Sequence, residues 1–117
     1  MVWRMVDDEL VRAHLQELRR GTVVMACLVA LRQPGHGYGL LEHLSGHGFA
    51  VEANTLYPLL RRLESQGLLT SEWDTAGPRP RKQYRTSADG EALLAVLLDD
   101  LAALRTSING LLEGPDA

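Results

Sequence analysis

The chain has 117 residues, of which 45% are apolar and 23% charged, and its net charge is −3. This balance is typical of one globular domain and excludes an intrinsically disordered chain. A single cysteine, Cys27, excludes an intrachain disulfide and therefore a small secreted disulfide scaffold. The longest apolar run, residues 23–31, is too short for a membrane span, and acidic residues near the N-terminus argue against a signal peptide. We therefore expect a cytoplasmic protein with no membrane partner.

Charge is unevenly distributed along the chain. Residues 53–86 carry six basic and three acidic side chains, a net charge of +3, whereas residues 87–117 carry one and six, a net charge of −5. Residues 1–52 are nearly neutral, with five arginines and six acidic residues. A basic segment beside an acidic one indicates that a single face of the protein meets a polyanion.

Three helices are predicted in the first half of the chain. Apolar residues at helical spacing and three acidic residues at the start predict a helix over residues 7–18, which Gly21 is expected to end. Thr22 is a suitable N-cap for a second helix over residues 22–32, which is apolar on nearly all sides and precedes a Pro-Gly dipeptide. A short third helix is expected over residues 38–44.

The middle of the chain predicts a fourth helix and a hairpin. Asn54 is a good N-cap for a helix over residues 54–66, and Pro58 lies near its first turn, where proline is best tolerated. Residues 68–73 and 81–86 are expected to form two strands, because turn residues rich in Gly and Pro separate them. The result is a two-stranded hairpin with a basic tip.

The last predicted helix begins after Ser87 and continues to about residue 112. Its apolar residues recur at alternating steps of three and four, which is the spacing of a coiled-coil seam. This row consists of Leu94, Leu97, Leu101, Leu104, Ile108 and Leu111. We expect the row to be buried, either against the first helix or against a second copy, and we favour packing across a two-fold axis in a homodimer.

This order of elements predicts a mainly α-helical fold with a small β-hairpin, namely a winged helix-turn-helix with an extra helix at each end. Residues 1–20 are expected to support a dimer, residues 21–86 to form the winged helix-turn-helix, and residues 87–117 to form the dimerisation helix and tail. The helix over residues 54–66 would be the recognition helix and the hairpin the wing. In a dimer the two recognition helices are expected about 34–36 Å apart, one turn of DNA.

Several motifs resemble the PadR family of bacterial transcription regulators. In chain order they are LRRGT at 18–22, GHGY at 35–38, NTLYPLLRRLE at 54–64, GL at 67–68 and PRKQYR at 80–85. The resemblance covers roughly residues 18–90, is most specific over residues 55–64, and is closest to the short subfamily with one C-terminal helix. It implies a winged-helix homodimer that represses genes and is released by a small effector. Gly39 replaces a usual acidic residue and Gln83 a common tyrosine, and both departures fall at the expected DNA surface.

The candidate DNA-binding residues lie on the recognition helix, before the preceding helix and on the wing. Arg61 and Arg62 project from a helix that fits the major groove, where arginine can bond guanine bidentately. His36 lies near a helix start, where backbone N–H groups favour a phosphate. The full set is His36, Tyr38, Asn54, Thr55, Tyr57, Pro58, Arg61, Arg62, Arg79, Arg81 and Lys82. The wing residues suit phosphates or a narrow minor groove. The alternative is a winged-helix module that binds a protein and no specific DNA.

Other candidate sites are weaker. His43 and His47 have the spacing of metal ligands, but Gly46 interrupts the helix and no third ligand is near, so we expect no metal or cofactor. Cys27 is expected to be a buried apolar side chain, although a metal or redox sensor through these residues is a further alternative. No serine or cysteine has a plausible base partner, so an enzyme is not expected.

The effector site is the least determined part of the sequence. The resemblance places it near the dimer interface, yet the last helix carries no aromatic residue. A chamber lined by Leu, Val and Met would accept a small apolar or aromatic molecule. Trp73 is expected in the core of the wing, and Trp3 in a frayed N-terminus.

Overall fold

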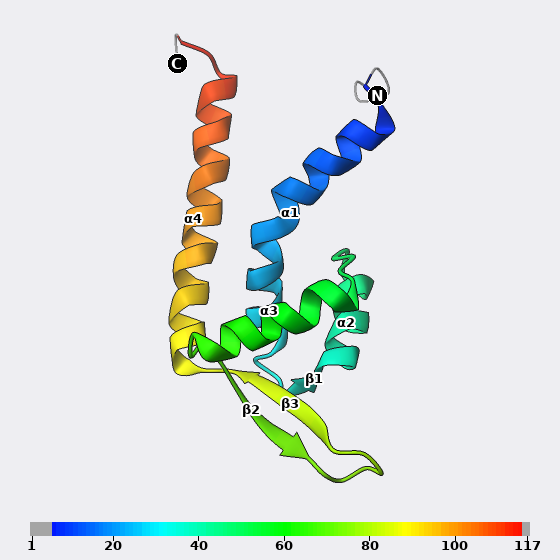
Figure 1. The fold of residues 1–117 in the computed structure, drawn as a ribbon. Helices are drawn as coiled ribbons and strands as arrows, with labels where there is room; N and C mark the ends of the chain where they lie inside the picture. Colours follow the sequence, from blue (N-terminus) through cyan, green and yellow to red (C-terminus); the bar gives the residue numbers. More distant parts are fainter. Residues whose placement is uncertain (1–5, 116–117) are drawn as a thin grey trace.

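The structure is a computed structural model that describes residues 6–115, so Trp3 lies outside the described residues. Within this range the elements, in chain order, are α1 (Asp8–Ala30), β1 (Gly35–His36), α2 (Gly37–Gly46), α3 (Ala53–Ser65), β2 (Leu69–Asp74), β3 (Arg81–Thr86) and α4 (Ala88–Leu112). The strands form one antiparallel sheet with the order β1-β3-β2. The predicted mainly helical fold with a small β-structure is confirmed (Figure 1). No helix within residues 6–115 is long and apolar enough to cross a bilayer.

The first two predicted helices are one continuous helix, α1, so the prediction of a break at Gly21 was wrong. Gly21 does not adopt the positive φ that ends many helices, and nothing lies close to its Cα. A glycine within a helix costs only about 1 kcal/mol relative to alanine, which the neighbouring turns offset. The Thr22 hydroxyl donates to the Arg19 carbonyl at 2.7 Å, a bond within the helix, and caps nothing. Asp7 is the N-cap, and it accepts a bond from the Glu9 backbone N–H.

Helix α3 begins one residue earlier than predicted, at Ala53, with Glu52 as its N-cap. The backbone N–H groups of Thr55 and Leu56 donate to the Glu52 carbonyl, so Asn54 lies inside the first turn and the prediction that it caps the helix was wrong. The predicted stop is confirmed, because Gly67 follows α3 with a φ of +78°, a conformation that favours glycine.

The hairpin is confirmed, but the sheet has a third strand that the sequence did not reveal. Strands β2 and β3 pair along their whole length, from Leu69 opposite Thr86 to Asp74 opposite Arg81. The two residues of β1 pair with the outer edge of β3. Two residues are too few for an alternating pattern, so no sequence signal marks β1.

The core lies where the end of α1, one face each of α2 and α3, the sheet and the start of α4 meet. Its fully buried apolar side chains include Cys27, Leu28, Leu31, Leu56, Leu60, Leu63, Leu69 and Leu94. Ser87 caps α4 as predicted, because its Oγ accepts from the Gly90 N–H at 3.0 Å. A side chain at Gly90 would overlap the Leu68 carbonyl, so only glycine allows α4 to start this close to the turn after α3.

Helices α1 and α4 meet at the core and then diverge into two separate arms (Figure 1). At their shared base the Arg32 guanidinium donates to both carboxylate oxygens of Glu91, at 2.7 and 3.0 Å. Of the six residues predicted for dimerisation, Leu94 belongs to the core of the chain itself and Leu97 is half-buried. The other four are exposed: Leu101, Leu104, Ile108 and Leu111. A single chain therefore does not bury the predicted row.

Candidate nucleic-acid interface

Helix α3 separates its side chains cleanly between core and solvent. Its leucines face the core. The exposed side chains of the helix include Asn54, Thr55, Pro58, Arg61 and Arg62. The spacing of the leucines at one face produces this division, since 3.6 residues make one helical turn. The exposed face therefore carries hydrogen-bonding and cationic groups on a rigid element. Such a face has the chemistry required to contact base edges and phosphates.

Tyr57 differs from the other predicted contacts on α3 because it is half-buried against the start of α2. A Cβ placed at Gly37 would overlap the Tyr57 ring, so this glycine lets α2 approach α3 closely. Tyr38, the next residue, is 65% exposed. Gly37 therefore determines how closely α2 and α3 pack. The sequence indicated it only as part of a turn.

His36 ties β1 to the far end of β2. Its Nε2 lies 2.9 Å from Oδ2 of Asp74, and both side chains are mostly buried. The other Asp74 oxygen accepts from the Ala76 N–H at 3.1 Å. These bonds, first that from Ala76 and then that from His36, hold the pKa of Asp74 below its usual value. The histidine predicted to contact DNA therefore also holds the wing in place.

A second polar cluster joins the wing to α3 on the opposite face of the sheet. The Lys82 ammonium on β3 donates to Glu64 Oε1 at 2.8 Å, and the Ser71 hydroxyl on β2 donates to Glu64 Oε2. The bond from Lys82, and then that from Ser71, lowers the pKa of Glu64, while the bond to Glu64 raises the pKa of Lys82. The charge of Lys82 is evident from the sequence, but its partner Glu64, which lies 18 residues away, is not.

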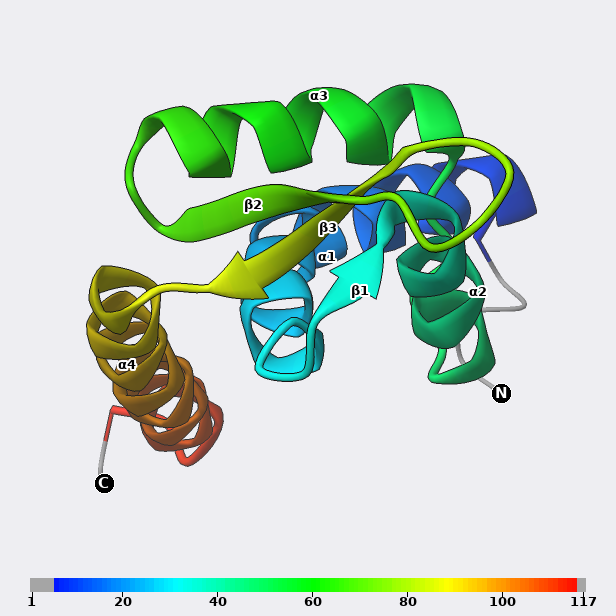
Figure 2. The same ribbon diagram turned by 90° about the horizontal axis from the view of Figure 1, so that it is seen from below.

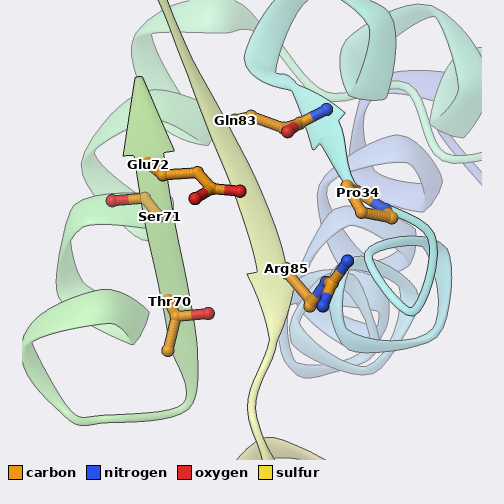
Figure 3. A pocket seen from close by; sticks show the side chains of 6 residues that line it. All are labelled: Pro34, Thr70, Ser71, Glu72, Gln83 and Arg85. Atoms are coloured by element: carbon orange, nitrogen blue, oxygen red, sulfur yellow. The ribbon is translucent and has the colours of Figure 1, made fainter. Parts of the chain in front are cut away.

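The outer face of the sheet is polar and slightly hollowed. Figure 3 shows Thr70 and Glu72 of β2 directed toward β3, whereas Ser71 turns the other way, toward α3. Pro34, Gln83 and Arg85 complete the shallow depression. Gln83 pairs in register with His36 on one side and Glu72 on the other. The departure from tyrosine at this position thus falls in the middle of the sheet and not at the tip of the wing.

The wing tip and the first turn of α3 lie at the same end of the molecule. Figures 1 and 2 both show the β2–β3 turn extending to the end where α2 lies and α3 begins. The exposed Arg79 and Arg81 belong to this turn and to the adjoining strand. The structure therefore places Arg79 and Arg81 at the end of the molecule where α3 begins.

Trp73 is 65% exposed, so the prediction that it fills the wing core was wrong. It pairs in register with Lys82, outside the part of β3 that pairs with β1. The hairpin has only two strands there, and a two-stranded ribbon has little core to offer a large side chain.

The alternative sensor residues have simple environments. Cys27 is fully buried as predicted, and burial raises its pKa to about 12, which keeps it a thiol. The His47 Nδ1 lies 2.9 Å from the His43 carbonyl oxygen, and the ring centroids are 4.6 Å apart. Residues 6–115 contain no group of three or more side chains placed to hold a metal ion.

A helix-turn-helix core, a β-wing and long terminal helices together define a winged-helix protein. The model of the Transcriptional regulator PadR-like family matches residues 25–96. Because this match covers more than half of the chain, the protein belongs to that family, and the resemblance expected from the motifs is confirmed.

Individual relatives agree with this assignment. The chain is similar to the transcriptional regulator Rv3488 of Mycobacterium tuberculosis, with 42% identity over 79 residues, which cover 68% of this chain and 71% of the relative. Its fold is similar to that of a PadR family transcriptional regulator from Eggerthella lenta, with a TM-score of 0.89, 50% identity, and coverage of 94% and 98% of the two chains. The structure of Bacillus subtilis PadR in complex with operator DNA is similar in fold at a TM-score of 0.60 and 23% identity, over 66% of this chain and 45% of that one.

Proposed function

We propose that this protein is a homodimeric transcription repressor that binds a pseudo-palindromic DNA operator and is released by a small effector. The observation that carries the proposal is the exposed face of α3, where Asn54, Thr55, Arg61 and Arg62 stand free of the core beside a basic wing. Membership of a transcription regulator family and the fold shared with a PadR protein solved on operator DNA support it. The proposal assigns the protein no catalytic role, no cofactor and a cytoplasmic location.

Each group of residues has a proposed role on the operator. Arg61 and Arg62 read guanine in the major groove, with Asn54 and Thr55 near the bases at the first turn of α3. Phosphate contacts are assigned to the exposed residues around this helix and on the wing. These are Tyr38, Arg79 and Arg81, with His36 and Tyr57 in supporting positions. Pro58 has no N–H to donate, so it is assigned a van der Waals contact with the DNA. Lys82 differs from them because its ammonium already bonds Glu64.

The homodimer is proposed to form between the arms. The exposed part of the apolar row on α4, from Leu101 to Leu111, and a shallow apolar depression on α1 both lack a partner within the described chain, and exposed apolar patches of this kind mark interfaces. The α1 depression is lined by Val6, Leu10, Val11, His14, Leu15 and Leu18. An isologous dimer covers both surfaces at once and places two copies of α3 for the two half-sites.

The effector is proposed to bind between the arms. Apart from His14, the side chains there are aliphatic, which suits a small apolar or aromatic molecule. Release requires that the effector binds the dissociated state more tightly than the DNA-bound state, since only a difference in affinity shifts the equilibrium.

The proposal is tested by fluorescence anisotropy with DNA from upstream of the protein's own gene, at two salt concentrations and against a scrambled competitor. Tight, sequence-selective binding that weakens with salt supports it. Arg62→Ala is expected to lower operator affinity by about 1–3 kcal/mol. Arg20→Ala, which removes the same charge from the exposed side of α1, is the matched control and is expected to change little.

Two results would contradict the proposal. Equal and weak binding to both DNAs at low salt favours the protein-interaction module. Unchanged operator affinity in Arg62→Ala removes this residue from the base-reading set.

A further inference from the structure

Three basic residues of the wing were expected to contact DNA, and Lys82 differs from the other two in its contacts within the chain. Within residues 6–115, Arg79 and Arg81 are exposed and form no ion pair, whereas Lys82 bonds Glu64 at 2.8 Å. The side chains of Lys82 and Glu64 are only 34% and 29% exposed. The Lys82 ammonium also lies 5.4 Å from the centre of the Tyr84 ring, a cation–π distance. Its charge is therefore directed into the protein.

Glu64 connects three elements through one carboxylate. It belongs to the last turn of α3, and its two oxygens accept separately, one from Lys82 of β3 and one from Ser71 of β2. Each strand of the wing is thus bonded to the same side chain of the recognition helix. Two hydrogen bonds to one rigid group fix an angle as well as a distance.

The position of this cluster along the hairpin strengthens its effect. Within residues 6–115, the hairpin makes no further polar bond to α3 from this cluster to its tip, and Trp73, which pairs in register with Lys82, is 65% exposed. The His36–Asp74 bond restrains the other face of the sheet but leads to β1 and α2, so it does not tie the wing to α3. Glu64 is the polar side chain of α3 that bonds both wing strands.

We infer that Glu64, Lys82 and Ser71 form a clamp that sets the position of the wing relative to the recognition helix. Lys82 then affects DNA binding as a positioning residue through Glu64, and the phosphate contacts of the wing belong to Arg79 and Arg81. This inference rests on the proposed DNA-binding function. It replaces a direct electrostatic role for Lys82 with a geometric one, and the two roles predict opposite results.

Neutralising Glu64 distinguishes the two roles of Lys82, because they predict changes of opposite sign in operator affinity. If the clamp positions the wing, Glu64→Gln lowers operator affinity by about three- to tenfold and leaves the dependence on salt unchanged. If Lys82 is a phosphate contact, the same variant releases its charge, so binding becomes tighter and the slope of log affinity against log salt becomes steeper. For Lys82→Ala, we expect a lower operator affinity with an unchanged slope of log affinity against log salt concentration. If the magnitude of this slope falls by about one, the inference is overturned, because the variant has then lost a phosphate contact.

The charge-swapped double variant Glu64→Lys with Lys82→Glu provides the rescue. A clamp predicts that affinity returns to within about threefold of the wild type, since the pair is restored in reverse. A phosphate contact predicts affinity at least as low as that of Lys82→Ala. Circular dichroism of each variant verifies that it is folded.

A second readout requires no DNA. The chain has two tryptophans, so Trp3→Phe leaves Trp73 as a single fluorophore on the wing. Time-resolved anisotropy of Trp73 is expected to show faster local motion in Glu64→Gln and in Lys82→Ala, and slower motion again in the charge-swapped variant. Unchanged motion in both single variants overturns the clamp, whereas failure of the wild type to bind DNA overturns only the proposed function.

Discussion

The body of the molecule and its two arms use the same residue type in opposite ways. In the body, Leu28, Leu56 and Leu60 are fully buried among elements of the same chain. In the arms, Leu104 of α4 is 56% exposed and Leu111 is 77% exposed. The leucines of the body are therefore covered within the chain, whereas those of the arms are not. In the proposed homodimer, the first group stabilises the fold and the second group forms the interface.

The largest expected effect is on the free energy of unfolding, and its dependence on protein concentration distinguishes the body from the arms. Leu60→Ala removes a fully buried side chain and is expected to lower the free energy of unfolding by about 2–5 kcal/mol at any concentration. Leu104→Ala is expected to have an effect that depends on protein concentration, because it weakens an association. Urea denaturation at two protein concentrations measures both. A large, concentration-independent loss in Leu104→Ala would contradict the assignment of α4 to an interface.

The arms are tested directly by a charge at the proposed interface. Leu104→Asp places a carboxylate on the apolar row of both copies and is expected to weaken the dimer by about 2–4 kcal/mol. Thr106→Asp adds the same charge on the opposite side of α4 by helical spacing, and it is the control. Light scattering during size-exclusion chromatography reports the mass. A dimer that persists in Leu104→Asp at micromolar concentration would place the interface elsewhere.

The junction between body and arm is expected to tolerate no side chain. Gly90→Ala brings a Cβ onto the Leu68 carbonyl and is expected to destabilise the protein by about 1–3 kcal/mol. Gly110→Ala is the matched control, since nothing lies near Gly110 in the arm and alanine favours a helix by up to about 1 kcal/mol. Thermal unfolding compares the two. Equal melting temperatures would show that the start of α4 can move.

The smallest expected effect is a dependence on pH that arises in the body. Ion pairs and hydrogen bonds lower the pKa of Glu64, Asp74 and Glu91 in the folded chain. A lowered carboxyl pKa contributes stability above the unfolded value of about 4, and this stability is lost as the pH falls through the lowered value. Thermal unfolding is therefore expected to show a decline below about pH 4. Glu64→Gln should flatten part of this decline, and an identical profile would contradict the contribution of the pair.

Much of the fold followed from local patterns in the sequence. The leucine spacing of α3, the hairpin and the Ser87 cap of α4 each depend on residues close together in the chain, and the structure confirms them. The predictions at Gly21 and Asn54 were wrong because each residue type is compatible with a helix interior when its neighbours favour the helix. Local propensity decides the type of an element more reliably than its ends.

The sequence allowed us to predict which residue types form the candidate site, but not which side chains bond to each other there. The sequence indicated a basic wing and a polar recognition helix, since charge and helical spacing are visible in it. The bonds from Lys82 to Glu64 and from His36 to Asp74 connect residues 18 and 38 positions apart, and only the tertiary fold brings them together. The exposure of Trp73 likewise depends on how the tertiary fold places the hairpin relative to the rest of the chain.

Because α1 is one continuous helix, its length determines how the arm is oriented relative to the core. One uninterrupted helix of 23 residues carries core contacts at its end and the apolar arm surface at its beginning. Each residue of an α-helix adds about 1.5 Å and about 100° of rotation. Inserting or deleting one residue in the middle of α1 would therefore turn the arm away from its partner while leaving the body intact. In the proposed homodimer, the length of α1 would therefore set the distance between the two copies of α3.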